Sequence, residues 1–115
     1  MGNPLRYRVI EAAMGLSELV HEQVHCSGFD RVPHLRSQLM RAVDSVPANI
    51  AEGARGTPGQ LRNHLRIARG SADEIGVHLR IARRTGAIEE HAYWACENRR
   101  TAVCKMITAF LRTVG

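Results

Sequence analysis

The spacing of the apolar residues between positions 58 and 86 restricts the fold of this sequence more than any other feature. They recur at alternating steps of four and three residues, as Leu61, Leu65, Ala68, Ala72, Ile75, Leu79 and Ala82. This spacing places all of them on one side of an α-helix, whereas a half-buried strand would alternate. Thr57-Pro-Gly-Gln60 forms a capping box with proline in the first turn, and Gly86 is a typical terminator. The sequence therefore predicts a long helix over residues 58–85, whose apolar side other helices must cover.

Three further segments show the same helical period, and proline or glycine delimits most of their ends. These expected helices span residues 4–27, 33–53 and 88–113. Their apolar stripes are Val9, Ala13, Leu16, Val20 and Val24; Leu35, Leu39, Val43, Val46 and Ile50; and Ile88, Ala92, Ala95, Val103, Ile107, Phe110 and Val114. Four amphipathic helices with short connections predict an all-α fold, an antiparallel up-and-down four-helix bundle. The length fits a single domain over residues 1–115.

Composition adds an expectation about where the protein works. Cys26, Cys96 and Cys104 form no C-x-x-C pair and cannot all pair with one another, which indicates free thiols in a reducing compartment. Cys96 and Cys104 are expected to be buried as small apolar residues. Charged residues interrupt the first twenty positions, and no uncharged apolar stretch approaches the ~20 residues that span a bilayer. We therefore expect a cytoplasmic protein with no signal peptide and no membrane contact.

The pentapeptide Leu-Arg-Ile-Ala-Arg occurs twice in the long helix, at residues 65–69 and 79–83. The offset of two heptads turns both copies in the same direction. Helical counting then gathers five arginines on one face: Arg62, Arg66, Arg69, Arg80 and Arg83. Guanidinium groups bind phosphate oxygens in pairs, and the net charge is +5. This arginine face predicts RNA or DNA binding; the alternatives are a solvated face paired with nearby acids, or an oligomer contact.

A third side of the same helix carries Ile67, Gly70, Val77 and Ile81. A bundle helix needs only about a third of its circumference to be apolar. Because these four residues lie on neither the core stripe nor the arginine face, they suggest a subunit interface. The alternative interpretation is a core face that is broad for a small bundle.

Ser45-Val-Pro-Ala-Asn-Ile-Ala-Glu-Gly53 places a proline inside a helical pattern. Pro47 removes the hydrogen bond to the carbonyl of Val43 and is expected to kink the helix. Polar side chains surround this break and could satisfy the freed backbone groups or contact a neighbouring subunit. We therefore assign Pro47, Asn49 and Glu52 to the oligomer interface.

This segment resembles the signature of the bacterial four helix bundle protein family, whose members include proteins encoded by intervening sequences in large-subunit ribosomal RNA genes. The similarity continues through residues 67–71, Glu74, and Gly86 with Ile88, and covers residues 10–114. It implies a bundle that assembles into a homo-oligomeric ring of five subunits, with no enzymatic activity. Accessory variability determinant proteins of diversity-generating retroelements are similar in fold; they are basic pentamers that hold a reverse transcriptase and its RNA.

His21-Glu-Gln-Val-His25 matches H-E-x-x-H, which on a helix can hold zinc between two histidines with the glutamate as base. A third ligand is lacking nearby, so we expect a surface pair and no metal or cofactor. The leading hypothesis is a non-catalytic oligomeric scaffold that binds RNA, DNA or a ribonucleoprotein partner through arginine-rich helix faces. The alternative is a protein-only interaction module, and the remote one a zinc hydrolase using His21, Glu22 and His25.

Overall fold

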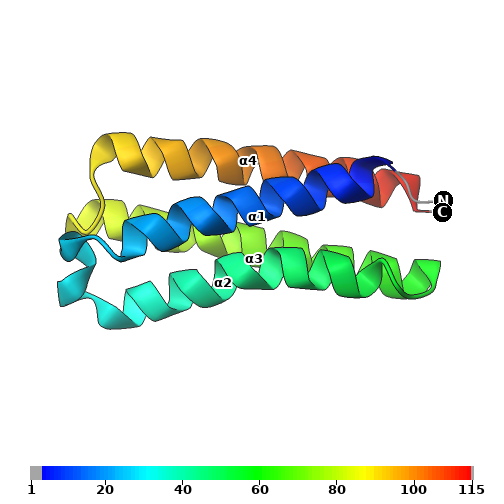
Figure 1. Cartoon of the computed structure of the whole chain (residues 1–115), viewed down its shortest axis with the longest axis horizontal. Coiled ribbons are helices and arrows are strands. Elements are labelled where there is room, and N and C mark those ends of the chain that lie inside the picture. The colour runs from blue at the N-terminus through cyan, green and yellow to red at the C-terminus, as the bar shows by residue number, and fades with distance from the viewer. Residues whose placement is uncertain (1–3, 115) are drawn as a thin grey trace.

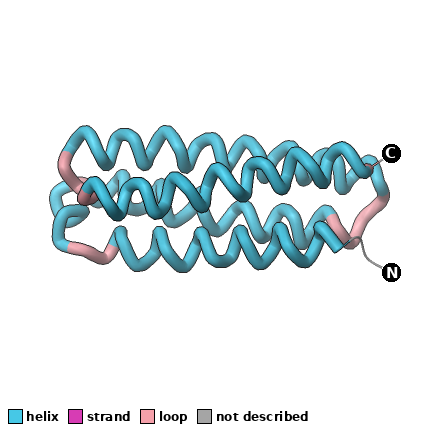
Figure 2. Tube along the Cα trace, turned by 90° about the horizontal axis from the view of Figure 1, so that it is seen from above, coloured by secondary structure: helices cyan, strands magenta, loops and turns pink. Residues whose placement is uncertain are grey.

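A computed structural model describes residues 4–114 of the chain and consists of helices joined by short connections (Figure 1). The elements in chain order are α1 (Pro4–Val24), η1, a 3₁₀-helix (Ser27–Arg31), α2 (Pro33–Gly53), α3 (Pro58–Thr85) and α4 (Glu90–Thr113). Each α-helix contacts the next one along the chain, and α4 closes against α1. Figure 2 shows the helices aligned along the long axis, with the connections confined to the two ends. The predicted antiparallel four-helix bundle is confirmed.

The core follows the predicted apolar stripes. All five stripe residues of α1 and all five of α2 are buried, as are six of the seven of α3, with Leu61 half-buried. In α4 the prediction was wrong for Ala95, which is exposed, while Tyr93 is 3% exposed. Cys96 and Cys104 are buried as expected, and burial raises the pKa of the Cys96 thiol to about 11. None of the helices in residues 4–114 has an apolar segment long enough to cross a membrane.

Two of the eight expected helix limits need correction, both at the same end of the bundle. The first helix ends at Val24 rather than at residue 27, because the chain turns into η1 and buries Phe29 in the core. Gly28 lies so close to the next connection that a Cβ there would be 2.2 Å from the carbonyl oxygen of Ala87. The last helix begins at Glu90 rather than at residue 88, because Ala87 and Ile88 are buried in that connection.

The signals that delimit α3 work as the sequence predicts. Gln60 N donates to Thr57 Oγ1 at 3.2 Å, and Thr57 N donates to Gln60 Oε1 at 2.8 Å, so both halves of the capping box form. At the other end Gly86 has a φ of 77°, a left-handed conformation that glycine adopts without strain. These ends set the length of α3, which carries most of the predicted site.

Candidate functional site

The five arginines of the predicted face divide into two groups. Arg66 and Arg80 are exposed and Arg62 is half-buried. Within the described residues, none of their three guanidinium groups forms a hydrogen bond or ion pair with another side chain. These three are therefore free to bind an external anion.

Arg69 contacts α4 instead. Its guanidinium group donates a short hydrogen bond to Thr108 Oγ1, and its Nε lies 3.5 Å from Asp73 Oδ1. Helical counting places Arg69 beside Arg62 and Arg66, but α4 lies close enough on this flank of α3 to engage the side chain. Arg69 thus belongs to the α3–α4 boundary more than to the outer surface.

Arg83 is held by a cluster at the start of α4. It donates two hydrogen bonds to the carboxylate of Glu90, at 2.9 and 2.6 Å. Its guanidinium carbon lies 4.8 Å from the ring centre of Tyr93 and 5.3 Å from that of Trp94, within cation–π range. Trp94 Nε1 donates to Glu90 at 3.0 Å. The hydrogen bonds to Glu90 raise the pKa of Arg83, and the same contact with Arg83 lowers the pKa of Glu90.

The predicted apolar side of α3 lies outside the core. Ile67, Val77 and Ile81 are 44%, 45% and 42% exposed. No atom would lie within 4 Å of a Cβ added at Gly70, so the helix surface there is open. Arg80 and Arg84 flank Val77 and Ile81 around a shallow depression. The alternative that these residues belong to a broad core face is therefore wrong for the single chain. We call Ile67, Gly70, Val77 and Ile81 the apolar strip.

The segment around Pro47 forms contacts within the chain. Helix α2 runs through Pro47 without interruption, and Pro47 is half-buried. Asn49 Nδ2 donates to the carbonyl oxygen of Ser45 at 2.9 Å, and Asn49 Oδ1 lies 3.0 Å from His64 Nδ1 of α3. The hydroxyl groups of Ser45 and Ser71 lie 2.9 Å apart. Most polar groups of this segment therefore join α2 to α3.

Two other members of the segment differ in exposure. Glu52 is exposed, and its carboxylate forms no hydrogen bond or ion pair among the described residues. Gly53 is buried, and a Cβ there would be 2.6 Å from His64 Cβ and 3.3 Å from Leu61 Cα. The glycine at the end of the motif therefore permits the close approach of α2 to α3, while the acidic side chain before it faces outward.

The two histidines of the H-E-x-x-H segment contact other groups of the bundle. His21 Nε2 lies 2.9 Å from Asp44 Oδ1 of α2, and His25 Nδ1 lies 2.6 Å from the carbonyl oxygen of His21. Glu22 is exposed. Within residues 4–114, no three side chains of His, Cys, Asp or Glu gather as ligands for one metal ion.

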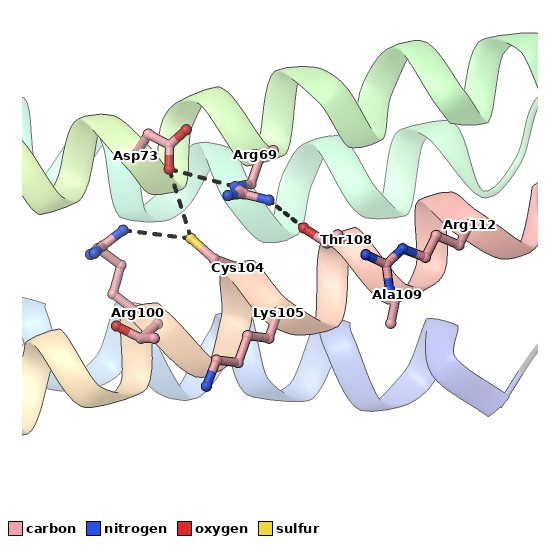
Figure 3. Close-up of a pocket in the computed structure, with 9 residues that line it drawn as sticks. Arg69, Asp73, Arg100, Cys104, Lys105, Thr108, Ala109 and Arg112 are labelled. Carbon is pink, nitrogen blue, oxygen red and sulfur yellow. Dashed lines mark hydrogen bonds and ion pairs between the residues drawn. The ribbon is translucent and has the colours of Figure 1, made fainter.

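The sequence analysis missed a groove between α3 and α4 (Figure 3). It encloses about 490 Å³, and its lining includes Arg69, Arg100, Lys105, Thr108 and Arg112. Helical counting along one helix cannot find such a site, because the two helices are distant in sequence. The spacing of Lys105, Thr108 and Arg112 on α4 was the available signal.

These observations define a small four-helix bundle protein whose longest helix presents free arginines beside an exposed apolar strip. The chain belongs to the family of 23S rRNA-intervening sequence proteins, which matches residues 6–109. The resemblance noted in the sequence is thus confirmed.

The chain is also similar to a solved structure, that of a protein with unknown function from the S23 ribosomal protein family of Bacteroides thetaiotaomicron. The two superimpose with a TM-score of 0.87 at 22% sequence identity, over 95% of this chain and 99% of that chain. At this identity the likeness supports the fold alone. No curated protein matches the chain.

Proposed function

We propose that this protein is a non-catalytic scaffold that assembles into a ring of identical subunits and binds RNA or DNA through the outer surface of α3. The observation that carries the proposal is the pairing of two features on one helix. Among residues 4–114, the guanidinium groups of Arg62, Arg66 and Arg80 form no hydrogen bond or ion pair, and the apolar strip lies next to them. One feature suits a polyanion and the other suits a second copy of the chain.

The apolar strip supports self-assembly. Burying apolar surface gains about 25 cal/mol per Å², and Gly70 would let another helix approach closely at its centre. Arg80 and Arg84 at its edge would form the polar rim that such interfaces have. We further propose five subunits, as the family resemblance implies, with Pro47 and Glu52 near the contact.

Assembly would also explain how few arginines could hold nucleic acid. Each subunit contributes only a small cationic patch, and three phosphate contacts alone give weak, salt-sensitive binding. Several patches held in one ring act together, and the effective concentration of the later contacts raises the avidity by orders of magnitude. The family's description, which names 23S rRNA intervening sequences, supports RNA as the polyanion.

Fluorescence anisotropy with a labelled RNA oligonucleotide tests the nucleic-acid part. The double variant Arg66→Glu/Arg80→Glu is expected to bind at least tenfold more weakly and to reduce the slope of affinity against salt. The matched control is Arg8→Glu/Arg41→Glu, which makes the same charge change at exposed positions of α1 and α2. Equal losses in both double variants would mean that net charge matters and the α3 surface does not.

The engagement of Arg69 and Arg83 within the chain favours a second candidate, a protein-only interaction module. In that case nucleic acid would not bind, and the same double variant on α3 would break the oligomer. Light scattering distinguishes the two by reporting the mass of each variant. A monomeric wild-type protein at micromolar concentration would contradict both candidates.

A further inference from the structure

The groove between α3 and α4 has the volume of a small-molecule site and a mainly cationic lining. Its volume of about 490 Å³ lies within the ~300–1,000 Å³ typical of such sites. Four cationic side chains line it, and Asp73 is the one acid among its described lining residues. Figure 3 shows the guanidinium groups of Arg69 and Arg112 lying on either side of Thr108.

The charges in the groove do not balance. Glu97 accepts two hydrogen bonds from Arg100, at 2.7 and 2.6 Å, and thereby neutralises it. Asp73 lies 3.5 Å from Arg69. Lys105 and Arg112 are exposed and have no carboxylate partner within the described residues. Two positive charges therefore remain uncompensated in one depression, which attracts anions.

Hydrogen-bond donors in the groove also lack acceptors. The Nε of Arg69 is buried without a hydrogen bond, because the oxygen of Asp73 is too distant at 3.5 Å for a good one. Thr108 Oγ1 accepts from Arg69, so its own hydroxyl proton can be donated elsewhere. The planar fork of Arg112 adds paired donors. An anion with several oxygen atoms would satisfy this set.

We propose that this groove binds a phosphate group, carried either by a phosphorylated small molecule or by a nucleic-acid backbone. The tetrahedral phosphate would lie between Arg69 and Arg112, accept from the Thr108 hydroxyl, and place its charge near Lys105. The proposal goes beyond the scaffold function, because Lys105, Thr108 and Arg112 are not part of the arginine face. A carboxylate is disfavoured, since it offers fewer oxygens to donors that converge from two helices.

Titration calorimetry on the full chain tests this site with three probes: inorganic phosphate, uridine 5′-monophosphate and a short RNA with 5′-hydroxyl ends. Uridine is the control without phosphate. We expect Lys105→Gln/Arg112→Gln to weaken at least one phosphate probe tenfold or more, while Arg8→Gln/Arg41→Gln changes it less than twofold. Thr108→Val, which removes one donor and keeps the shape, is expected to weaken the same probe severalfold.

The pattern among probes identifies the carrier. Binding of the mononucleotide indicates a small-molecule site, and binding of the RNA alone indicates a backbone contact. If no phosphate probe depends on Lys105 and Arg112, or if uridine binds as well as its monophosphate, the groove is not a phosphate site. RNA binding that depends on Arg66 and Arg80, while no phosphate probe depends on Lys105 and Arg112, refutes this inference and leaves the scaffold function intact. RNA binding that depends on Lys105 and Arg112 but not on Arg66 and Arg80 supports the groove as a phosphate site and contradicts the proposed role of the α3 surface.

Discussion

Two glycines within helices should respond to alanine substitution in opposite directions. Gly53 is buried near the end of α2, where a new Cβ would lie 2.6 Å from His64 Cβ and 3.3 Å from Leu61 Cα. Neither of those atoms can move by side-chain rotation, so α2 and α3 would have to separate. Gly70 lies in the middle of α3, and a Cβ there meets no atom within 4 Å. Each substitution therefore adds one methyl group, at a crowded position for Gly53 and at an open position for Gly70.

The magnitudes follow from two opposing effects. Alanine is favoured over glycine inside a helix by about 0.5–1 kcal/mol, and this gain applies at both positions. At Gly53 overpacking costs about 1–3 kcal/mol, which exceeds the gain. We expect Gly53→Ala to lower the free energy of unfolding by about 1 kcal/mol and Gly70→Ala to raise it by about 0.5–1 kcal/mol. The difference corresponds to about 8 °C in Tm between the two variants.

Urea unfolding followed by far-UV circular dichroism measures both variants. The protein concentration must be equal, because assembly makes apparent stability depend on it. Gly70→Ala should also be compared across a dilution series, since the added methyl group would disturb a close helix contact between subunits. A Gly53→Ala protein as stable as the wild type would refute the close approach of α2 and α3 on which this reasoning depends.

Three further predictions concern local contacts. Thr57→Ala should cost about 1 kcal/mol in urea unfolding, with Thr57→Ser nearly unchanged, because the capping box loses one acceptor. The pKa of Glu90 is lowered in the folded protein by its contact with Arg83. The stability from this ion pair is therefore present above the ordinary pKa of 4.5 and is lost as the pH falls through the lowered pKa. Fluorescence of Trp94, the one tryptophan, should report that loss in acid, and Glu90→Gln should abolish the transition. Because burial raises the pKa of Cys96 to about 11, iodoacetamide should modify exposed Cys26 first; equal rates by mass spectrometry would contradict the burial.

The fold could be predicted from the sequence because its helix ends are marked by local chemistry. Pro33 and Gly53 are the observed limits of α2, and Pro58 and Gly86 mark those of α3, because proline and glycine act through their own backbone. The end of α1 was predicted less well. Burial of Phe29 in η1 depends on a gap between helices, which no helical period in that segment reveals.

The candidate site was harder to predict, since a helical wheel gives direction but not neighbours. It placed Arg69 and Arg83 on one face with Arg66, yet it could not show that α4 supplies Thr108 and Glu90 as their partners. Those partners depend on how far α4 leans over that flank of α3. The sequence placed the apolar strip on a side of its own but left open whether the core covers it, and the exposure of Ile67, Val77 and Ile81 decides that question for the single chain.

The stability of the single chain does not account for the residues of the apolar strip. Ile67, Val77 and Ile81 are more than 40% exposed and contribute little to its core. They are β-branched, so they lose side-chain freedom in a helix and are poorer helix formers than the Lys, Glu or Ala that suit exposed positions. Neither packing nor helix propensity within the chain therefore favours them. The subunit interface proposed above would account for three such residues on one side of a helix, and Arg62, Arg66 and Arg80 would then lie beside that interface.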